Sequence, residues 1–409
     1  MKVLVTGGAG LIGSHTVDLA LEHGHEVRII DSLQPRVHPR GKPEWVPGEA
    51  EFVQGDVADR EDMSRALEGM EAVFHLAAYQ DYMPDFSHFI QTNTESTALL
   101  FELIVSDRRR YPVRKIVFAS SQAVCGEGCY LCPSCAGGII PPSIEEQLTH
   151  AARHLACYPG KRYSSSDLPP HAIHVPRART IDHLLLGDWE MHCPACGEYM
   201  RPLLIDEDTI SPGTTYGISK YAIELLADRL GRRYSIPTVC MRYTYVQGPR
   251  NSFFNAYSGI ARRFALRILH GLPPVIYEDG RQLRDYVNVQ DVARANLLVL
   301  EDSRADFKVF NVGGGRAVSV SDFARIMLES FASELEPEVP GEFRVGDTRH
   351  TVSDISELRA LGWEPIITVE QNVTEYVAWM REQRGTKEYL EEAERVMREL
   401  GVVRRVRAG

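Results

Sequence analysis

The sequence predicts an α/β protein built around a doubly wound parallel sheet, and two observations in its first third carry this prediction. Short apolar runs alternate along the chain with segments whose apolar residues recur at helical spacing. The apolar runs are nearly continuous, as in strands that helices cover on both faces of a sheet. The strands are expected at residues 2–6, 26–31, 51–56, 72–78 and 115–121, and the helices at 11–23, 60–69 and 89–106.

The alternation stops near residue 127 and resumes near residue 213. The segment between these points is rich in proline, cysteine and histidine and shows little periodicity. Beyond it, the pattern predicts a buried strand at 238–243, helices at 216–234, 257–270, 289–301, 319–331, 370–384 and 387–400, and a frayed tail at 404–407. An insert of a different kind therefore interrupts the α/β pattern.

The composition is that of an ordinary globular protein, since 44% of the 409 residues are hydrophobic and 25% are charged. No apolar run approaches the roughly 20 residues of a membrane-spanning helix, and the first residues enter a strand without a cleavable signal pattern. We therefore expect a cytoplasmic protein. The net charge of −11 argues against nucleic acid or an anionic membrane as partner, but a phosphorylated small molecule needs only a few local arginines.

Gly7, Gly10 and Gly13 lie where the first expected strand turns into the first expected helix. Gly7 permits a tight turn, Gly10 lets the backbone approach a pyrophosphate, and Gly13 allows close packing of helix on strand. Asp31 ends the second strand, where a carboxylate accepts both ribose hydroxyls and repels a 2′-phosphate. The pattern predicts a Rossmann-type site for NAD rather than NADP. An ordinary turn and a solvated strand-end acid are the alternatives.

Tyr216 and Lys220 lie four residues apart on an expected helix and therefore share one of its faces. A tyrosine with an ordinary pKa near ~10 is a poor base at neutral pH, but a neighbouring ammonium and a nicotinamide cation favour its phenolate. Ser120 and Ser121 end the fifth expected strand. Combined with the glycine loop, these residues indicate a proton-transfer site beside a nicotinamide.

Together these motifs resemble the extended short-chain dehydrogenases, in the branch of NAD-dependent nucleotide-sugar epimerases and dehydratases. The resemblance continues through 75–78, Asn93, 242–243, 248–250, 284–289 and 344–347. It implies that Ser121 hydrogen-bonds the sugar 4-hydroxyl, Tyr216 removes its proton, and Lys220 holds the nicotinamide ribose. It also implies that Arg284 and Arg344 clamp the substrate diphosphate, with Arg250 and Asn251 nearby. The cofactor-binding residues it implies are Gly7, Gly10, Leu11, Ile12, Gly13, Asp31, Asp56, Val57, Leu76, Ala77, Ala78, Asn93, Tyr216, Lys220 and Tyr243.

The residues after Ser121 bear on the reaction. In the dehydratases of this branch, Asp and Glu stand where this chain has Gln122 and Ala123, and neither is an acid or base at neutral pH. The resemblance thus implies C4 epimerisation of a nucleoside-diphosphate sugar through a transient 4-keto sugar. Segments 245–259 and 276–280 are most similar to dTDP-L-rhamnose 4-epimerases, with UDP-sugar 4-epimerases as near alternatives, although Tyr245 replaces the Asn usual there. A 4-keto-sugar reductase and a non-catalytic NAD-binding regulator are the other hypotheses.

The insert separates Ser121 from Tyr216 by 95 positions (216 − 121) and contains two C-x-x-C pairs. Cys132, Cys135, Cys193 and Cys196 match two zinc knuckles, and four thiolates close a tetrahedral site with no position for water. We expect a structural zinc that stabilises a subdomain with little apolar core. A redox dithiol is the alternative. Cys129 or a histidine of the insert could replace a ligand, the histidines being His150, His154, His171, His174, His183 and His192.

These features divide the chain into three expected parts. Residues 1–126 and 213–246, with 286–305 returning, form an NAD-binding Rossmann domain, and residues 127–212 form a zinc-ribbon-like insert. Residues 247–285 and 306–409 form a smaller, C-terminal substrate-binding domain. From the family resemblance alone we also expect a homodimer formed through helices that flank Tyr216.

Overall fold

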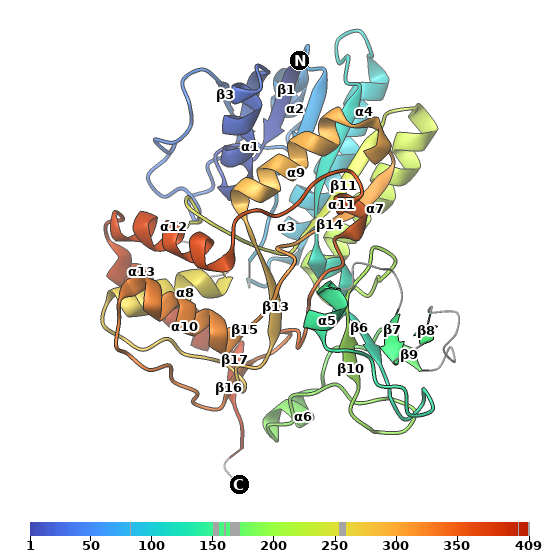
Figure 1. Ribbon diagram of the computed structural model, residues 1–409. Helices are drawn as coiled ribbons and strands as arrows, with labels where there is room; N and C mark the ends of the chain where they lie inside the picture. Colours follow the sequence, from blue (N-terminus) through green and yellow to red (C-terminus); the bar gives the residue numbers. More distant parts are fainter. Residues whose placement is uncertain are drawn as a thin grey trace.

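A computed structural model of the chain describes residues 1–81, 83–149, 155–158, 161–163, 172–252, 259–399 and 401–407. Its centre is a seven-stranded parallel sheet in the order β14-β11-β5-β4-β1-β2-β3, which confirms the predicted doubly wound sheet (Figure 1). The chain order reverses between β1 and β4, so a crevice opens at the carboxyl ends of these strands. The strands are β1 (Lys2–Thr6), β2 (Glu26–Asp31), β3 (Glu51–Gln54), β4 (Ala72–His75), β5 (Lys115–Ser121), β11 (Thr238–Tyr243) and β14 (Lys308–Val312).

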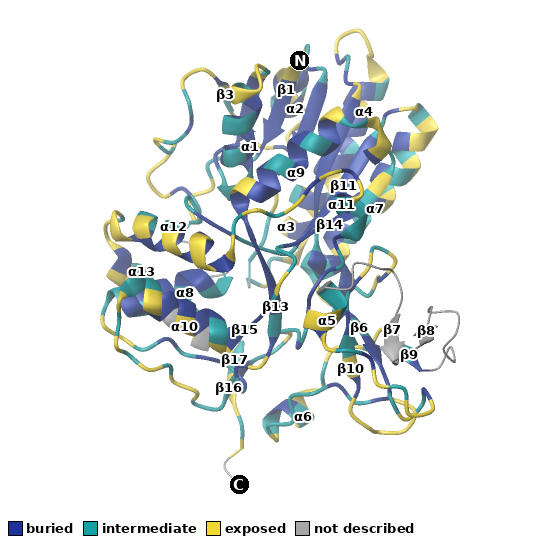
Figure 2. Cartoon of the chain, viewed as in Figure 1, coloured by how far each residue is buried: buried dark blue, intermediate teal, exposed yellow. Residues whose placement is uncertain are grey.

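Helices cover both faces of this sheet, which is why its strands are nearly continuous in apolar residues. One face packs against α1 and α9, and the other against α2, α4 and α7. Figure 2 shows the strands as the most deeply buried part of the molecule. The helices are α1 (Leu11–Glu22), α2 (Arg60–Leu67), α4 (Ser96–Ser106), α7 (Thr215–Tyr234), α9 (Val289–Glu301) and α11 (Ser356–Arg359), with the short 3-10 turns η2 (Gln122–Cys125) and η4 (Ser303–Ala305).

The helix expected at 89–106 is divided by a π-helical segment. It begins with α3 (Phe86–Phe89), continues as the π-helical η1 (Ile90–Glu95) and ends as α4. Within η1, the Asn93 side-chain amide donates to Ser219 Oγ at 2.9 Å and the Thr94 hydroxyl donates to the Ser219 carbonyl at 3.2 Å. The π-helical turn therefore fastens this segment to α7, which carries Tyr216.

A smaller lobe lies beneath the sheet and has its own apolar core. Its centre is a three-stranded sheet in the order β12-β13-β15. One boundary differs from the sequence analysis: β14, within the range 306–409 assigned to this lobe, pairs with β11 and completes the large sheet. The elements of the lobe are β12 (Tyr245–Gln247), β13 (Leu283–Asn288), β15 (Ala317–Ser319), α8 (Gly259–Leu269), α10 (Val320–Phe331), α12 (Val369–Arg381) and α13 (Thr386–Glu399).

The tail expected to be frayed is instead a strand. β17 (Val403–Arg405) pairs antiparallel with β16 (Glu342–Arg344), because the backbone of 342–344 offers an unpaired edge. The Arg407 backbone N–H also donates to the Leu185 carbonyl of the insert at 2.9 Å. The C-terminal strand therefore connects the smaller lobe to the insert.

The insert lies beside the smaller lobe, below the sheet (Figure 1). Its described residues form a three-stranded sheet in the order β10-β6-β9, a separate pair β7-β8, and two small buried clusters. Its elements are β6 (Cys129–Leu131), α5 (Ile144–Thr149), β7 (Leu155–Tyr158), β8 (Lys161–Tyr163), β9 (Ile173–His174), α6 (Ile181–Leu185) and β10 (Arg201–Leu203). In the described part of the whole chain, no helix has the length and apolar character needed to cross a membrane.

Candidate active site

A cavity of about 850 Å³ opens at the carboxyl ends of the sheet strands, within the range typical of small-ligand sites. The large sheet, the smaller lobe and the insert all contribute to its lining. Most residues that the sequence singled out for cofactor and substrate line it. They are Gly7, Gly10, Leu11, Ile12, Gly13, Asp31, Asp56, Val57, Leu76, Ala77, Ala78, Ser121, Tyr216, Tyr243, Arg250, Asn251 and Arg344.

The glycine loop has the geometry of a pyrophosphate cradle. Gly7 has a φ of +69°, and a Cβ there would lie 2.9 Å from the Ala77 Cα. A Cβ on Gly13 would lie 2.1 Å from the Gly7 carbonyl oxygen, so only glycine permits the helix to approach the strand this closely. Gly10 caps α1 without a side-chain hydrogen bond, which leaves the amides of the first turn to an anionic ligand.

Asp31 is held beside this loop by two backbone amides. Its Oδ2 accepts from the Ala9 N–H at 3.0 Å and its Oδ1 accepts from the Leu33 N–H at 2.9 Å. The carboxylate is buried but lines the cavity, and each oxygen retains lone pairs for a ribose hydroxyl. The residues present therefore fit a dinucleotide such as NAD.

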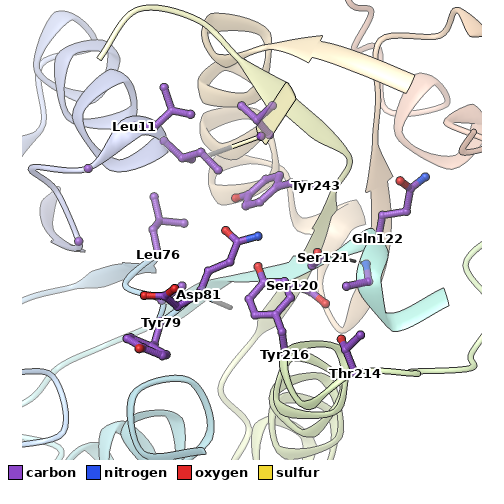
Figure 3. Close-up of a pocket in the computed structure, with 18 of the residues that line it drawn as sticks. Leu11, Leu76, Tyr79, Asp81, Ser120, Ser121, Gln122, Thr214, Tyr216 and Tyr243 are labelled. Carbon is purple, nitrogen blue, oxygen red and sulfur yellow. Dashed lines mark hydrogen bonds between the residues drawn. The ribbon is translucent and has the colours of Figure 1, made fainter. Parts of the chain in front are cut away.

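Tyr216 and Ser121 face the cavity from α7 and from the end of β5 (Figure 3). The N-cap of α7 is Thr214, whose hydroxyl accepts from the Gly217 N–H at 3.0 Å. A Cβ on Gly217 would lie 2.5 Å from the Ala123 carbonyl oxygen, so this glycine lets α7 approach the turn after Ser121. The Ser121 Oγ accepts from the Ala123 N–H at 3.1 Å, which leaves its hydroxyl proton available to a ligand.

Lys220 lies behind Tyr216 and is fully buried rather than exposed to the cavity. Its Nζ donates to the Ala119 carbonyl at 2.8 Å and lies 5.7 Å from the centroid of the Tyr216 ring. Burial lowers the pKa of Lys220 to about 7. The amine is thus fixed close to the phenol but is costly to charge without a ligand.

The residues after Ser121 offer little acid–base chemistry. The Gln122 side-chain amide donates to Ser353 Oγ at 2.9 Å, and Figure 3 shows the side chain directed away from Tyr216.

Glu127 also lines the cavity, and burial raises its pKa. One of its carboxylate oxygens accepts from the Arg349 N–H at 2.8 Å and the other lies 3.6 Å from Arg179 Nε, so both are held by neighbouring groups.

Besides Lys220, two of the predicted binding residues lie outside the cavity lining. The Asn93 amide group is buried between Tyr79 and Ser219, where it positions α7. The Arg284 guanidinium donates to the carbonyls of Leu283, Thr348 and Arg349 at 2.7–2.9 Å. It therefore braces segment 348–349, a placement that the family resemblance did not anticipate.

Other lining residues were not identified from the sequence. Tyr79, Gln80 and Asp81 line the cavity directly after Ala78, so the end of the fourth strand was a usable signal for them. Arg36 also lines it and pairs with Asp81 at 2.6 Å. The insert contributes residues 176–178, 211 and 212 to the lining. No local pattern marks these insert residues, because their position depends on how the insert packs.

The four cysteines of the two C-x-x-C pairs meet in the insert, and their sulfurs all lie within 4.8 Å of one another. Cys132 Sγ is 3.5 Å from Cys196 Sγ, and Cys135 Sγ is 3.8 Å from Cys193 Sγ. Sulfurs placed tetrahedrally at roughly 2.3 Å from a zinc ion are about 3.8 Å apart. The donor set and its spacing therefore fit a zinc ion.

The other candidate ligands are placed differently. Cys129 is not part of the four-cysteine group. His174 Nε2 lies 3.5 Å from Cys193 Sγ, the place of a hydrogen-bond donor to a thiolate. His183 and His192 group with Asp188 instead. The remaining histidines of the insert, His150, His154 and His171, lie outside the described residues.

Comparison with known proteins agrees with this geometry. Residues 3–158 and 193–313, more than half of the chain, match the NAD dependent epimerase/dehydratase family. The chain is 30% identical to the dTDP-L-rhamnose 4-epimerase of Burkholderia thailandensis, over 94% of this chain and 96% of that protein. The UDP-glucose 4-epimerase of Thermotoga maritima, solved with UDP-glucose, is 28% identical with a TM-score of 0.67, over 93% of this chain and 99% of that one. The Thermus thermophilus UDP-glucose 4-epimerase, solved with NAD, is 27% identical with a TM-score of 0.65, and the match again covers 93% of this chain and 99% of that one.

Proposed function

The chain belongs to the NAD-dependent epimerase/dehydratase family, and we propose that it inverts the C4 centre of a nucleoside-diphosphate sugar. One arrangement carries this proposal: Ser121 and Tyr216 face the cavity with Lys220 behind them. The positions that follow Ser121 carry an amide tied to Ser353 and a methyl group. This supports proton and hydride exchange at C4 without the additional acid and base that dehydration requires.

NAD, when bound, supplies a hydride acceptor and donor at its nicotinamide ring. The Ser121 hydroxyl donates to the 4-oxygen of the sugar, and Tyr216 takes the 4-hydroxyl proton as C4 is oxidised. With NAD bound, Lys220 would favour the Tyr216 phenolate through its charge and would hold the nicotinamide ribose. The 4-keto sugar then rotates in the pocket, where the small Ala123 leaves room for it, and Tyr216 returns the proton.

The substrate is proposed to be dTDP-L-rhamnose-like or a UDP-hexose. The Burkholderia thailandensis relative, named for dTDP-L-rhamnose, supports the first, and the Thermotoga maritima structure with UDP-glucose supports the second. We assign the diphosphate contact to Arg344, with Arg250 and Asn251 as further candidates, because all three line the cavity. Arg284 acts indirectly by bracing segment 348–349.

The decisive experiment incubates the purified protein, without added cofactor, with dTDP-L-rhamnose and then with UDP-hexoses and UDP-hexuronates. Proton NMR follows the sugar product and absorbance follows NADH. A C4 epimer that forms without net NADH supports the proposal. Stoichiometric use of NADH on a 4-keto sugar would indicate the reductase instead, and no turnover after NAD and zinc are restored would favour the regulator.

Tyr216→Phe tests the mechanism because it removes only the phenolic hydroxyl. We expect kcat to fall by about 10²- to 10⁴-fold, the usual contribution of general acid–base catalysis, with thermal stability unchanged. Tyr221→Phe, on the same helix but outside the cavity, is the matched control and should retain activity. Equal rates for the two variants would remove Tyr216 from the mechanism.

We further propose that Cys132, Cys135, Cys193 and Cys196 hold a structural zinc ion, supported by the spacing of their sulfurs. Mass spectrometry should find one zinc per chain, and X-ray absorption should find four sulfur ligands at roughly 2.3 Å. Cys193→Ser should lose the metal and Cys129→Ser should retain it. A metal-free protein whose four thiols oxidise reversibly would support the redox alternative.

The cytoplasmic location and the homodimer stay predictions. Exposed Ile218 and Leu225, one heptad apart on α7, support an interface at that helix. Sedimentation of the wild-type protein and of an Ile218→Glu variant measures the oligomeric state. A monomeric wild-type protein would contradict the expected homodimer.

A further inference from the structure

The insert forms part of the cavity wall through residues 176–178, beside segment 346–348 of the smaller lobe, which also lines the cavity. Within 176–178, Arg177 carries a charge and is solvent-exposed. A cation at this place is a second feature of the insert, independent of its cysteines.

Four arginines line the cavity, and they differ in their partners. Arg36 pairs with Asp81 at 2.6 Å, and Arg250 with Asp18 at 2.7 Å. Arg344 donates to the Asp347 carboxylate at 2.7 Å. Arg177 makes no hydrogen bond or ion pair with any residue that the structure describes. Among the described residues, therefore, none occupies the donors of its guanidinium.

The position of Arg177 is set by its neighbour Arg179. The Arg179 guanidinium forms two hydrogen bonds to the Glu278 carboxylate at 2.8 and 2.9 Å and a third to the Asp347 carbonyl at 2.7 Å. The Arg179–Glu278 pair is almost fully buried, and the fully buried Arg349 side chain contacts Glu278 as well. A paired, desolvated contact of this kind is costly to break, so it holds segment 176–179 against the smaller lobe.

The anchoring of Arg179 also restricts the position of Arg177. Two residues of extended chain span at most about 7 Å, so the backbone of Arg177 stays close to that of Arg179. Arg179 contacts the backbone of residue 347, next to Arg344. The backbone of Arg177 therefore lies at the part of the cavity wall that the insert shares with the smaller lobe.

We propose that Arg177 binds an anionic oxygen of the substrate, so that the insert completes the substrate site. This inference rests on the proposed function for the identity of the substrate. Two groups of a nucleoside-diphosphate sugar offer such an oxygen: the diphosphate, and the carboxylate of a hexuronate. A guanidinium fork suits both, because it donates two parallel hydrogen bonds.

The test measures ligand affinity by calorimetry in the full-length NAD-bound protein and so does not depend on turnover. The probes are UDP, dTDP, UDP-glucose and UDP-glucuronate, with wild type, Arg177→Gln and Arg177→Lys. Arg201→Gln is the matched control, since Arg201 is an exposed arginine of the insert on β10, outside the cavity lining. Affinity of the protein for NAD shows whether the fold is intact.

We expect Arg177→Gln to weaken binding by roughly 10- to 100-fold, as for loss of a charge-assisted hydrogen bond, with partial recovery in Arg177→Lys. An equal loss for all four probes assigns the contact to the diphosphate, and a loss confined to UDP-glucuronate assigns it to the carboxylate. Affinities within twofold of wild type for every probe overturn the inference. If the wild-type protein binds these probes but converts no nucleotide sugar, the proposed reaction is wrong. The Arg177 contact is then still tested by the affinities of the variants.

Discussion

Lys220 creates a conflict between stability and catalysis that a single substitution measures. Its amine is fully buried, with one hydrogen bond to the Ala119 carbonyl, and burial lowers its pKa from 10.5 to about 7. At about 1.4 kcal/mol per pH unit, this difference means that the ligand-free fold disfavours the ammonium by roughly 5 kcal/mol. We expect Lys220→Met, which keeps a long unbranched side chain, to stabilise the ligand-free protein.

The size of this effect depends on pH in a defined direction. Because the folded-state pKa of Lys220 lies below its unfolded value, the unfolded chain binds the extra proton between about pH 7 and 10.5. Wild-type stability therefore rises with pH through that window, and the penalty is constant below it. Subtracting about 1 kcal/mol for the lost hydrogen bond, Lys220→Met should gain about 4 kcal/mol at pH 6 and about 1 kcal/mol at pH 9.

Urea unfolding of the NAD-free protein, followed by tryptophan fluorescence at pH 6 and pH 9, measures both values. Trp45 donates to the Ala9 carbonyl at 3.0 Å and so reports on the glycine loop. Lys115→Met is the matched control: this buried lysine is 2.5 Å from the Asp306 carboxylate, and its loss should lower the free energy of unfolding. A destabilised Lys220→Met protein, or a gain that is the same at both pH values, would refute the reasoning. The variant should also be inactive, because Tyr216 loses its neighbouring ammonium.

Three further changes have expected outcomes. Arg349→Leu removes a fully buried guanidinium 3.1 Å from the buried Glu278 carboxylate and should cost about 3–5 kcal/mol in the free energy of unfolding, measured in urea. Gly13→Ala places a Cβ 2.1 Å from a backbone oxygen of the same loop and should abolish NAD binding in calorimetry, whereas Gly48→Ala, with open space around it, should bind normally. Asp31→Asn removes the negative charge expected beside the ribose hydroxyls. It should weaken the binding of NAD and strengthen the binding of NADP, each by roughly tenfold in the dissociation constant, and so reduce the preference for NAD over NADP.

Much of the large sheet was predictable from local pattern. The strands at 2–6, 26–31, 115–121 and 238–243 form at the predicted bounds, because runs of apolar residues mark strands buried on both faces. The glycine loop and Asp31 were recognisable for a similar reason, since a tight turn and a strand end constrain residue type at fixed spacing. Tyr216 and Lys220 required only that a helix place residues four apart on one face.

Other features depended on contacts between distant segments. β14 was assigned to the smaller lobe because nothing local shows that 308–312 pairs with β11 rather than with a nearer strand. β17 resembled a charged tail until the edge of β16 was available to pair with it. Arg284 carries the family pattern, yet its guanidinium is directed to main-chain carbonyls whose position the motif does not specify.

By itself, therefore, the sequence determined the fold class, the glycine loop, the placement of Tyr216 and Lys220 on one helix face and the two C-x-x-C pairs. The glycine loop, the Tyr216–Lys220 spacing and each C-x-x-C pair lie within one element or one turn, where covalent geometry alone relates the residues. Only the tertiary structure decided which side chains from distant segments meet: Gln122 donates to Ser353, and Arg179 anchors the insert on Glu278. It also decided that Arg177 lines the cavity without a partner among the described residues. Those contacts join residues far apart in the chain, and no short-range pattern records them.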